Sequence, residues 1–208
     1  MKQSDDKRVF VFDFGKVLLD WDVRYLYRPY FTDGDSLEYF LNEIEFYGWN
    51  NQQDSQPSLN PGIAEQVRKY PHREELIRLY DESYPLSING PIVGSVKILQ
   101  QLYDQRWHLF GLSNFNSAKF ASIMPQYPFF YYFEKIILSG DVGVNKPSPR
   151  IFEILLEQIA RRASECIFID DSLTNVHTAI SMGFDAIHFI SPEQLLVELN
   201  IRGFDLVL

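Results

Sequence analysis

Short apolar runs recur along most of the chain and are separated by patterns typical of amphipathic helices. The runs lie at residues 9–12, 107–112, 136–138, 167–169 and 186–190. Runs that are apolar almost throughout favour strands buried on both faces of a parallel sheet. Helical spacing of apolar residues covers 91–103, 149–159 and 173–182, and Gly183 is well placed to end the last helix. This alternation predicts an α/β fold with a doubly wound parallel sheet.

Residues 20–90 interrupt that alternation. They show no convincing strand pattern, and helices are expected at 23–31, 37–46, 59–69 and 74–80, with Asp22 as the N-cap of the first and a polar loop at 50–61. We therefore expect an α/β core domain of residues 1–19 and 91–208 and a helical insert of residues 20–90. An insert after the first strand would lie over the carboxyl ends of the strands, where ligands bind in such sheets.

Composition narrows the classes of function. The chain has 208 residues and a formal net charge of −9, which argues against a nucleic-acid-binding surface but allows a small phosphorylated ligand in a locally basic pocket. No apolar run approaches the roughly 20 residues of a membrane span, and the charged start lacks a signal-peptide pattern. The single cysteine, Cys166, excludes a disulfide framework. We expect a cytoplasmic protein without nucleic-acid or membrane partners.

Polar side chains follow four of the predicted strands. They are Asp13, the pair Ser113-Asn114, the segment 139–147 with Asp141 and Lys146, and the pair Asp170-Asp171. The carboxyl ends of parallel strands meet at one edge of a sheet, so these groups are expected to converge. The three carboxylates Asp13, Asp170 and Asp171 offer only oxygen atoms as ligands, which suits a hard cation such as Mg²⁺. This ion commonly binds one or two carboxylates and a substrate phosphate. Lys146 and Ser113 could then hold that phosphate.

Four motifs in this order carry a family resemblance: DFGKV at 13–17, LSN at 112–114, Lys146-Pro147 and DDSLTN at 170–175. Together they resemble the haloacid dehalogenase-like (HAD) superfamily, in particular its phosphatase branch with a helical cap inserted after the first strand and a Rossmann-like core. The opening D-x-G followed by LLDWD resembles bacterial sugar-phosphate phosphatases of the α-D-glucose-1-phosphate phosphatase type.

The resemblance implies a role for each motif residue. Asp13 would be the nucleophile that carries the phosphoryl group as a phosphoaspartate and would also bind magnesium. Gly15 would offer its main-chain carbonyl to the metal, Asp171 would be the main distal ligand, and Asp170 a direct or water-mediated one. The remaining residues would bind phosphate: Ser113, Asn114 and Lys146, which would also balance the charge of Asp13.

Gly15 departs from the pattern of relatives with a full D-x-D opening. In those relatives the second aspartate is the general acid and base, a contribution typically worth about 10²–10⁴-fold in rate. We hypothesise that the protein either favours a good leaving group, such as an anomeric sugar phosphate, or recruits another acid. Asp20, Asp22 and an insert residue are the candidates.

The leading interpretation is a magnesium-dependent phosphomonoester hydrolase that acts on a small metabolite, with a sugar phosphate as the first candidate. One alternative is a metal-independent 2-haloacid dehalogenase, against which Gly15 and the paired acids 170–171 argue. Another is a non-catalytic module that binds a phosphate ligand, for which the missing acid is the support. A monomer or a weak homodimer is expected.

Overall fold

A five-stranded parallel sheet forms the centre of the computed structural model, which describes residues 8–58 and 60–208. The strand order is β5-β4-β1-β6-β7, and every neighbouring pair is parallel. The strands are β1 (Val9–Phe12), β4 (Leu109–Ser113), β5 (Lys135–Leu138), β6 (Cys166–Asp170) and β7 (Asp185–His188). The predicted α/β class with a doubly wound sheet is confirmed, and every strand end lies within two residues of the end of its apolar run.

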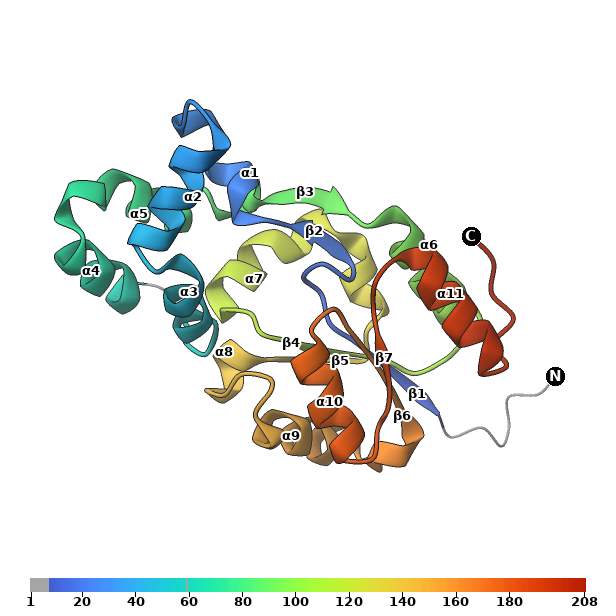
Figure 1. Ribbon diagram of the computed structural model, residues 1–208. Coiled ribbons are helices and arrows are strands. Elements are labelled where there is room, and N and C mark those ends of the chain that lie inside the picture. The colour runs from blue at the N-terminus through green and yellow to red at the C-terminus, as the bar shows by residue number, and fades with distance from the viewer. Residues whose placement is uncertain (1–7, 59) are drawn as a thin grey trace.

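Both faces of the sheet are buried. Successive strand residues point to opposite faces, so each strand contributes to two hydrophobic clusters. In β1, Phe10 and Phe12 belong to one hydrophobic cluster, while Val9 and Val11 belong to another. Helices α6 (Val93–Asp104) and α11 (Pro192–Ile201) contribute to the first cluster, and α9 (Pro149–Ile159) and α10 (Leu173–Ser181) to the second. Figure 1 shows these two helix pairs on opposite sides of the sheet.

The helices within residues 20–90, here called the helical insert, lie beyond the carboxyl ends of the strands, to the left in Figure 1. Its helices are α1 (Val23–Tyr27), α2 (Gly34–Glu43), α3 (Phe46–Asp54), α4 (Asn60–Lys69) and α5 (Glu74–Glu82). Asp22 is the N-cap of α1, as predicted, and its side chain accepts a hydrogen bond from the Arg24 main-chain N–H. The remaining helices are α7 (Ser117–Ile123), α8 (Ser139–Val142) and the short 3₁₀ turns η1 (Arg28–Tyr30), η2 (Pro71–Arg73), η3 (Tyr84–Ser87), η4 (Met124–Gln126), η5 (Pro128–Tyr132) and η6 (Ala163–Glu165).

The expectation that residues 20–90 contain no strand is wrong. Strand β2 (Leu19–Trp21) pairs antiparallel with β3 (Ile88–Pro91), so a two-stranded ribbon joins the helical insert to the core at both of its ends. Each strand is only three or four residues long and holds a single aliphatic residue, with polar or turn-forming neighbours. Such segments lack the apolar run or alternation by which strands are found in a sequence, and their pairing across about 70 residues is a tertiary effect.

Two boundaries also differ from the sequence prediction. Residues 50–54, expected to be loop, form the last turn of α3, where Trp49 Nε1 donates to the Gly62 carbonyl and anchors the helix. Pro91, expected as the first residue of a helix, ends β3, and α6 begins two residues later. Leu59, the first residue of the helix predicted at 59–69, lies outside the described residues.

Core side chains hold the C-terminal end of α3 over the sheet. The last carbonyls of a helix lack partners within the helix and need other donors. Asn116 Nδ2 donates to the carbonyls of Gln53 (3.2 Å) and Gln56 (2.6 Å), and Ser139 Oγ donates to that of Asp54 (2.5 Å). Asn116 is fully buried and is also the N-cap of α7. One core residue therefore fixes both α7 and the insert.

No helix in residues 8–58 and 60–208 has the length and apolar character that crossing a lipid bilayer requires.

Two substitutions at position 116 separate its two roles. Asn116→Ser keeps an N-cap acceptor for α7 but removes the amide that binds the insert carbonyls, whereas Asn116→Ala removes both. Both variants should lower the free energy of unfolding, and Ala should cost about 1 kcal/mol more than Ser. Urea unfolding followed by circular dichroism measures both. A Ser variant as stable as the wild type would mean that the amide–carbonyl bonds contribute nothing.

Candidate active site

Three carboxylates and a hydroxyl meet where β1, β4 and β6 end. Asp13 follows β1 directly, and Ser113 is the last residue of β4. Asp170 is the last residue of β6, and Asp171 follows it. Because β1 lies between β4 and β6, these side chains are neighbours. Ser113 Oγ donates a hydrogen bond of 2.7 Å to Asp13 Oδ1. The convergence expected from the strand-end pattern is therefore present.

Lys146 lies at the centre of the group and is only 3% exposed. Its Nζ is 2.9 Å from Asp13 Oδ1, 2.6 Å from Asp170 Oδ2 and 2.7 Å from the Leu112 carbonyl oxygen. An ammonium has three donors, and these three acceptors satisfy them. Burial disfavours the charged form of Lys146, but attraction to Asp13 and Asp170 outweighs it and raises the pKa.

Asn114 holds the main chain of Lys146 in place. Its Oδ1 accepts from the Lys146 main-chain N–H at 2.7 Å, and its Nδ2 donates to the Lys146 carbonyl at 2.9 Å. Asn114 lines the cavity described below, but both ends of its amide are used in this loop contact. Asn114 therefore positions the main chain of Lys146, and one N–H of its amide is not used in that contact. The phosphate contact expected from the sequence stays a prediction.

The carboxylates form a candidate metal centre. Asp13, Asp170 and Asp171 each offer an oxygen, and these atoms all lie within 4.8 Å of one another. Burial raises the pKa of Asp13 from 3.8 to about 7, with Lys146 opposing the rise and the other two acids adding to it. Burial, and then the charge of Asp170, raises the pKa of Asp171 as well. One ammonium does not balance three carboxylates, so this oxygen-only group fits a divalent hard cation.

Asp170 and Asp171 differ in their remaining capacity. Asp170 is fully buried, and it accepts from the Ser172 main-chain N–H (2.8 Å), from Asn175 Nδ2 (3.0 and 3.1 Å) and from Lys146. These bonds occupy both of its oxygens. Asp171 is only partly buried and lines the cavity. Asp171 is therefore better placed to bind a metal, while Asp170 fixes Lys146 and Asn175.

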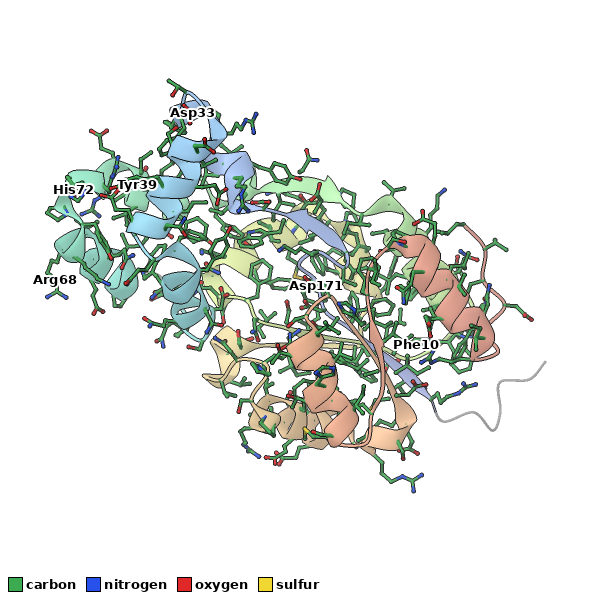
Figure 2. All side chains as sticks on the ribbon, viewed as in Figure 1. Phe10, Asp33, Tyr39, Arg68, His72 and Asp171 are labelled. Atoms are coloured by element: carbon green, nitrogen blue, oxygen red, sulfur yellow. The ribbon has the colours of Figure 1, made fainter. Side chains whose placement is uncertain are left out.

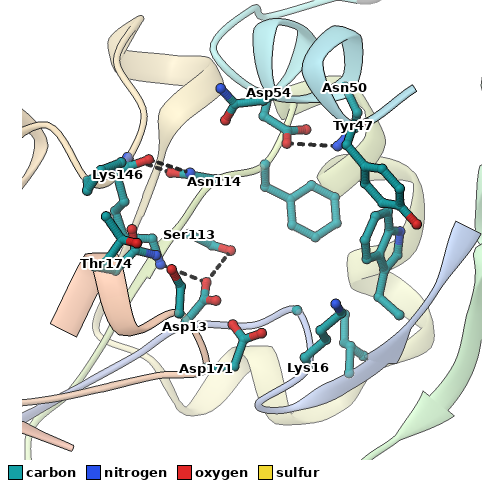
Figure 3. A pocket seen from close by; sticks show the side chains of 18 of the residues that line it. Asp13, Lys16, Tyr47, Asn50, Asp54, Ser113, Asn114, Lys146, Asp171 and Thr174 are labelled. Atoms are coloured by element: carbon teal, nitrogen blue, oxygen red, sulfur yellow. Dashed lines mark hydrogen bonds and ion pairs between the residues drawn. The ribbon is translucent and has the colours of Figure 1, made fainter. Parts of the chain in front are cut away.

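A cavity of about 520 Å³ opens over this group, between the core and the helical insert. Its lining includes Asp13, Gly15, Ser113, Lys146 and Asp171. Figure 3 shows Asp13, Ser113 and Asp171 close together on one side. The other walls carry aromatic rings, two amides and one carboxylate, chiefly from the insert. These residues are Trp21, Tyr47, Asn50, Asn51, Asp54, Tyr80, Tyr84 and Phe115. Figure 2 places Asp171 between sheet and insert, whereas Tyr39, Arg68 and His72 lie at the far end of the insert. The volume suits a small-molecule ligand.

Gly15 lies in the cavity wall, and steric hindrance is not the reason for a glycine there. A Cβ built on Gly15 would meet no atom within 4 Å, and the backbone does not need a positive φ. The next residue, Lys16, has φ of 59° and also lines the cavity. The site therefore has room for a side chain at position 15 but does not have one.

The two acids considered as replacements lie elsewhere. Asp20 accepts hydrogen bonds from Tyr25 and Asn89, and Asp22 caps α1 and pairs with Arg24; neither lines the cavity. The cavity acid that the sequence analysis missed is Asp54, at the end of α3. The stretch 50–61 reads as a polar loop, so nothing in the sequence separates Asp54 from surface acids. Its role depends on the docking of α3 against the core.

Comparison with known proteins gives one family match and several partial relatives. The family model described as haloacid dehalogenase-like hydrolase matches residues 30–189. A D-ribitol-5-phosphate phosphatase of Bacteroides thetaiotaomicron is 31% identical over 85 residues, and a sesquiterpene phosphatase of Aspergillus oryzae is 28% identical over 110. These matches cover 38% and 53% of the chain, and 41% and 56% of the relatives. A drimenol cyclase of Aspergillus calidoustus is 29% identical over 109 residues, which are 52% of the chain and 21% of that protein.

Solved structures of low sequence identity share the fold. A HAD family enzyme from Bacteroides thetaiotaomicron superposes with a TM-score of 0.73 at 20% identity, over 92% of this chain and 98% of that one. The same enzyme in complex with magnesium and inorganic phosphate gives a TM-score of 0.68 at 22% identity, over 88% and 94%. A dehalogenase gives 0.65 at 20% identity, over 88% and 84%. At these identities the likeness establishes the fold alone.

The raised pKa of Asp13 predicts a pH dependence of stability in metal-free protein. Because the folded-state pKa lies above the unfolded value of 3.8, the stability linked to Asp13 is full below about pH 4 and is lost as the pH rises through about 7. Asp13→Asn should remove that part. The difference in unfolding free energy, variant minus wild type, should therefore rise by on the order of a few kcal/mol between about pH 4 and pH 8. Denaturant unfolding in chelator measures this, and parallel curves for the two proteins would contradict it.

Proposed function

Since the chain belongs to the haloacid dehalogenase-like hydrolase family, we propose that it is a magnesium-dependent phosphomonoester hydrolase with Asp13 as its nucleophile. One observation supports this assignment above others. The Asp13 carboxylate lies in the floor of the cavity, next to two further acids, and is held by Ser113 and Lys146. A carboxylate in such a position can take a phosphoryl group covalently.

The proposed first step joins an Asp13 carboxylate oxygen to phosphorus while the bond from phosphorus to the ester oxygen breaks. In this step the N–H of Lys146 and the O–H of Ser113 that now contact Asp13 turn to oxygens of the transferred group. Such fixed donors in a buried site stabilise the charge that develops during transfer. Asn114 contributes by holding the main chain of Lys146.

Asp13, Asp171 and the Gly15 carbonyl are the groups that would hold magnesium, with Asp170 in support. The acid cluster fits this role because its charge exceeds that of Lys146. When bound, the ion supplies positive charge for the phosphoryl oxygens. The attacking carboxylate must be ionised, and Lys146 opposes the burial that raises its pKa.

The proposed substrate is a small phosphorylated metabolite, with a sugar or polyol phosphate as first candidate. The wall opposite Asp13 combines the rings of Trp21 and Tyr47 with the amides of Asn50 and Asn51. Rings offer flat apolar faces and amides offer hydrogen bonds, a mixture that suits a polyhydroxylated ligand. A relative named as a D-ribitol-5-phosphate phosphatase agrees with a polyol phosphate, and a relative named as a sesquiterpene phosphatase makes prenyl phosphates the competing class.

The test is phosphate release from aryl, sugar, polyol and prenyl monophosphates, each with magnesium or with chelator. We expect turnover that requires magnesium and is lost in Asp13→Asn by at least about 10³-fold, because the covalent step has no other nucleophile. Sugar or polyol phosphates should give the highest kcat/KM among the alkyl esters.

Asp20→Asn is the matched control, because Asp20 lies outside the cavity and bonds only with Tyr25 and Asn89 in the described contacts. It should keep wild-type turnover. Folded wild-type protein that releases no phosphate from any ester in magnesium would refute the proposal. Halide release from a 2-haloacid without metal would replace it with a dehalogenase.

A further inference from the structure

The hydrolysis proposed above needs a proton for the departing alkoxide and a base for the attacking water, and Gly15 supplies neither. Three carboxylates line the described cavity: Asp13, Asp54 and Asp171. Asp13 is the proposed nucleophile and Asp171 a proposed metal ligand. Figure 3 shows Asp54 across the cavity from Asp13. In an in-line transfer the leaving oxygen lies on the far side of phosphorus from Asp13, which is the side of Asp54.

We propose that Asp54, a residue of the helical insert, is the general acid and base of this reaction. The inference rests on the proposed phosphatase function and assigns the proton transfers that the core leaves without a donor. It also gives the insert a chemical role, because Asp54 lines the same cavity as the core residues of the site.

Hydrogen bonds from core residues fix the main chain of α3 around Asp54. Its main-chain carbonyl accepts from Ser139 Oγ at 2.5 Å, and the neighbouring Gln53 carbonyl accepts from buried Asn116. A third contact joins Asn145 Nδ2 to Asn51 Oδ1 at 3.2 Å. Three core residues thus bind the last turn of α3. Proton transfer requires the carboxylate to come within hydrogen-bond reach of the substrate oxygen, about 2.6–3.2 Å.

The carboxylate of Asp54 is also oriented. Tyr80 Oη donates to Asn50 Oδ1 at 2.5 Å, which fixes the amide so that Asn50 Nδ2 donates to Asp54 Oδ2 at 3.0 Å. The dashed line in Figure 3 marks the second bond. Both bonds come from residues that line the same cavity. Since Asn50 contacts Oδ2, Oδ1 is the oxygen proposed to exchange a proton with the substrate.

The charges that face Asp54 suit a group with two protonation states near neutrality. Burial raises its pKa from 3.8 to about 7, the ammonium of Lys119 opposes the rise, and Asp13 adds to it. Lys119 is buried over the rings of Tyr80 (3.5 Å) and Tyr84 (4.7 Å), and its Nζ makes no hydrogen bond within the described residues. Burial lowers the pKa of Lys119 to about 7, against attraction to Asp54 and to Asp81.

The two half-reactions balance through one proton on Asp54. In the first, an Asp13 oxygen bonds to phosphorus, the ester P–O bond breaks, and the proton of Asp54 passes to the departing alkoxide. In the second, a water oxygen bonds to phosphorus, the Asp13 O–P bond breaks, and the water proton passes to the Asp54 carboxylate. Inorganic phosphate leaves, and Asp54 is protonated again.

The test compares Asp54→Asn with wild type on an alkyl phosphate and on p-nitrophenyl phosphate, whose leaving group needs no proton. In rapid-quench experiments with magnesium, the variant should release the first p-nitrophenol per site at the wild-type rate. Later turnovers should slow by about 10²–10⁴-fold, because water attack lacks its base. The alkyl ester should slow by a similar factor from its first turnover. The amplitude of the aryl burst reports the fraction of folded protein.

Lys119→Met gives an independent test, since methionine can fill the space between the rings without the charge. The pH limb of alkyl-ester turnover that belongs to Asp54 should move to higher pH, because the opposing cation is gone. Asp20→Asn again serves as the control and should match wild type in both experiments. An Asp54→Asn variant that slows the first turnover of both esters equally, or of neither, would overturn the proposal. Turnover by the wild type keeps that result separate from failure of the phosphatase function.

Discussion

The buried ion pair of Lys146 with Asp13 and Asp170 is the interaction on which the rest of the site depends. Breaking a buried charge pair leaves an uncompensated charge and is strongly destabilising, typically by about 3–5 kcal/mol. Here one ammonium joins the ends of β1 and β6 and the carbonyl of β4, so it fixes three strand ends together. It does so without neutralising the carboxylates, which leaves a place for a cation. The arrangement that joins the strand ends therefore also leaves excess negative charge, which a bound cation would balance.

The helical insert is held against the core by several contacts. A two-stranded ribbon, β2 with β3, joins it to the core, and hydrogen bonds from Asn116, Ser139 and Asn145 reach the end of α3. These bonds satisfy carbonyls that the helix leaves free, so they exist only when the insert lies over the core. The contact between insert and core therefore forms the cavity wall and also places Asp54 across the cavity from Asp13.

Much of the core could be predicted from the sequence because its signals are local. Asp13 and Asp170 lie at the ends of runs of buried apolar residues. A parallel sheet brings such strand ends to one edge, whatever the packing of the surrounding helices. The ribbon was missed because β2 and β3 are short and gain stability only from each other. Asp54 was missed for a related reason: its burial and the nearby Lys119 depend on the packing of segments far apart in the sequence. Its bond to Asn50 is local, but it exists because residues 50–54 are helical, which their polar sequence does not predict. Asn114 was found as a site residue, but its bonds to the Lys146 main chain follow from a loop path that the sequence does not specify.

Whether Asp13 becomes covalently phosphorylated is the central claim of this account. Protein is mixed in magnesium with a phosphate ester that carries radioactive phosphorus, quenched in acid and digested, and the labelled peptide is sequenced. We expect label on the peptide that contains Asp13, at higher occupancy in Asp54→Asn than in wild type, and none in Asp13→Asn. Phosphate release from wild type with no label on that peptide in either protein would contradict the account, because water would then attack the ester directly.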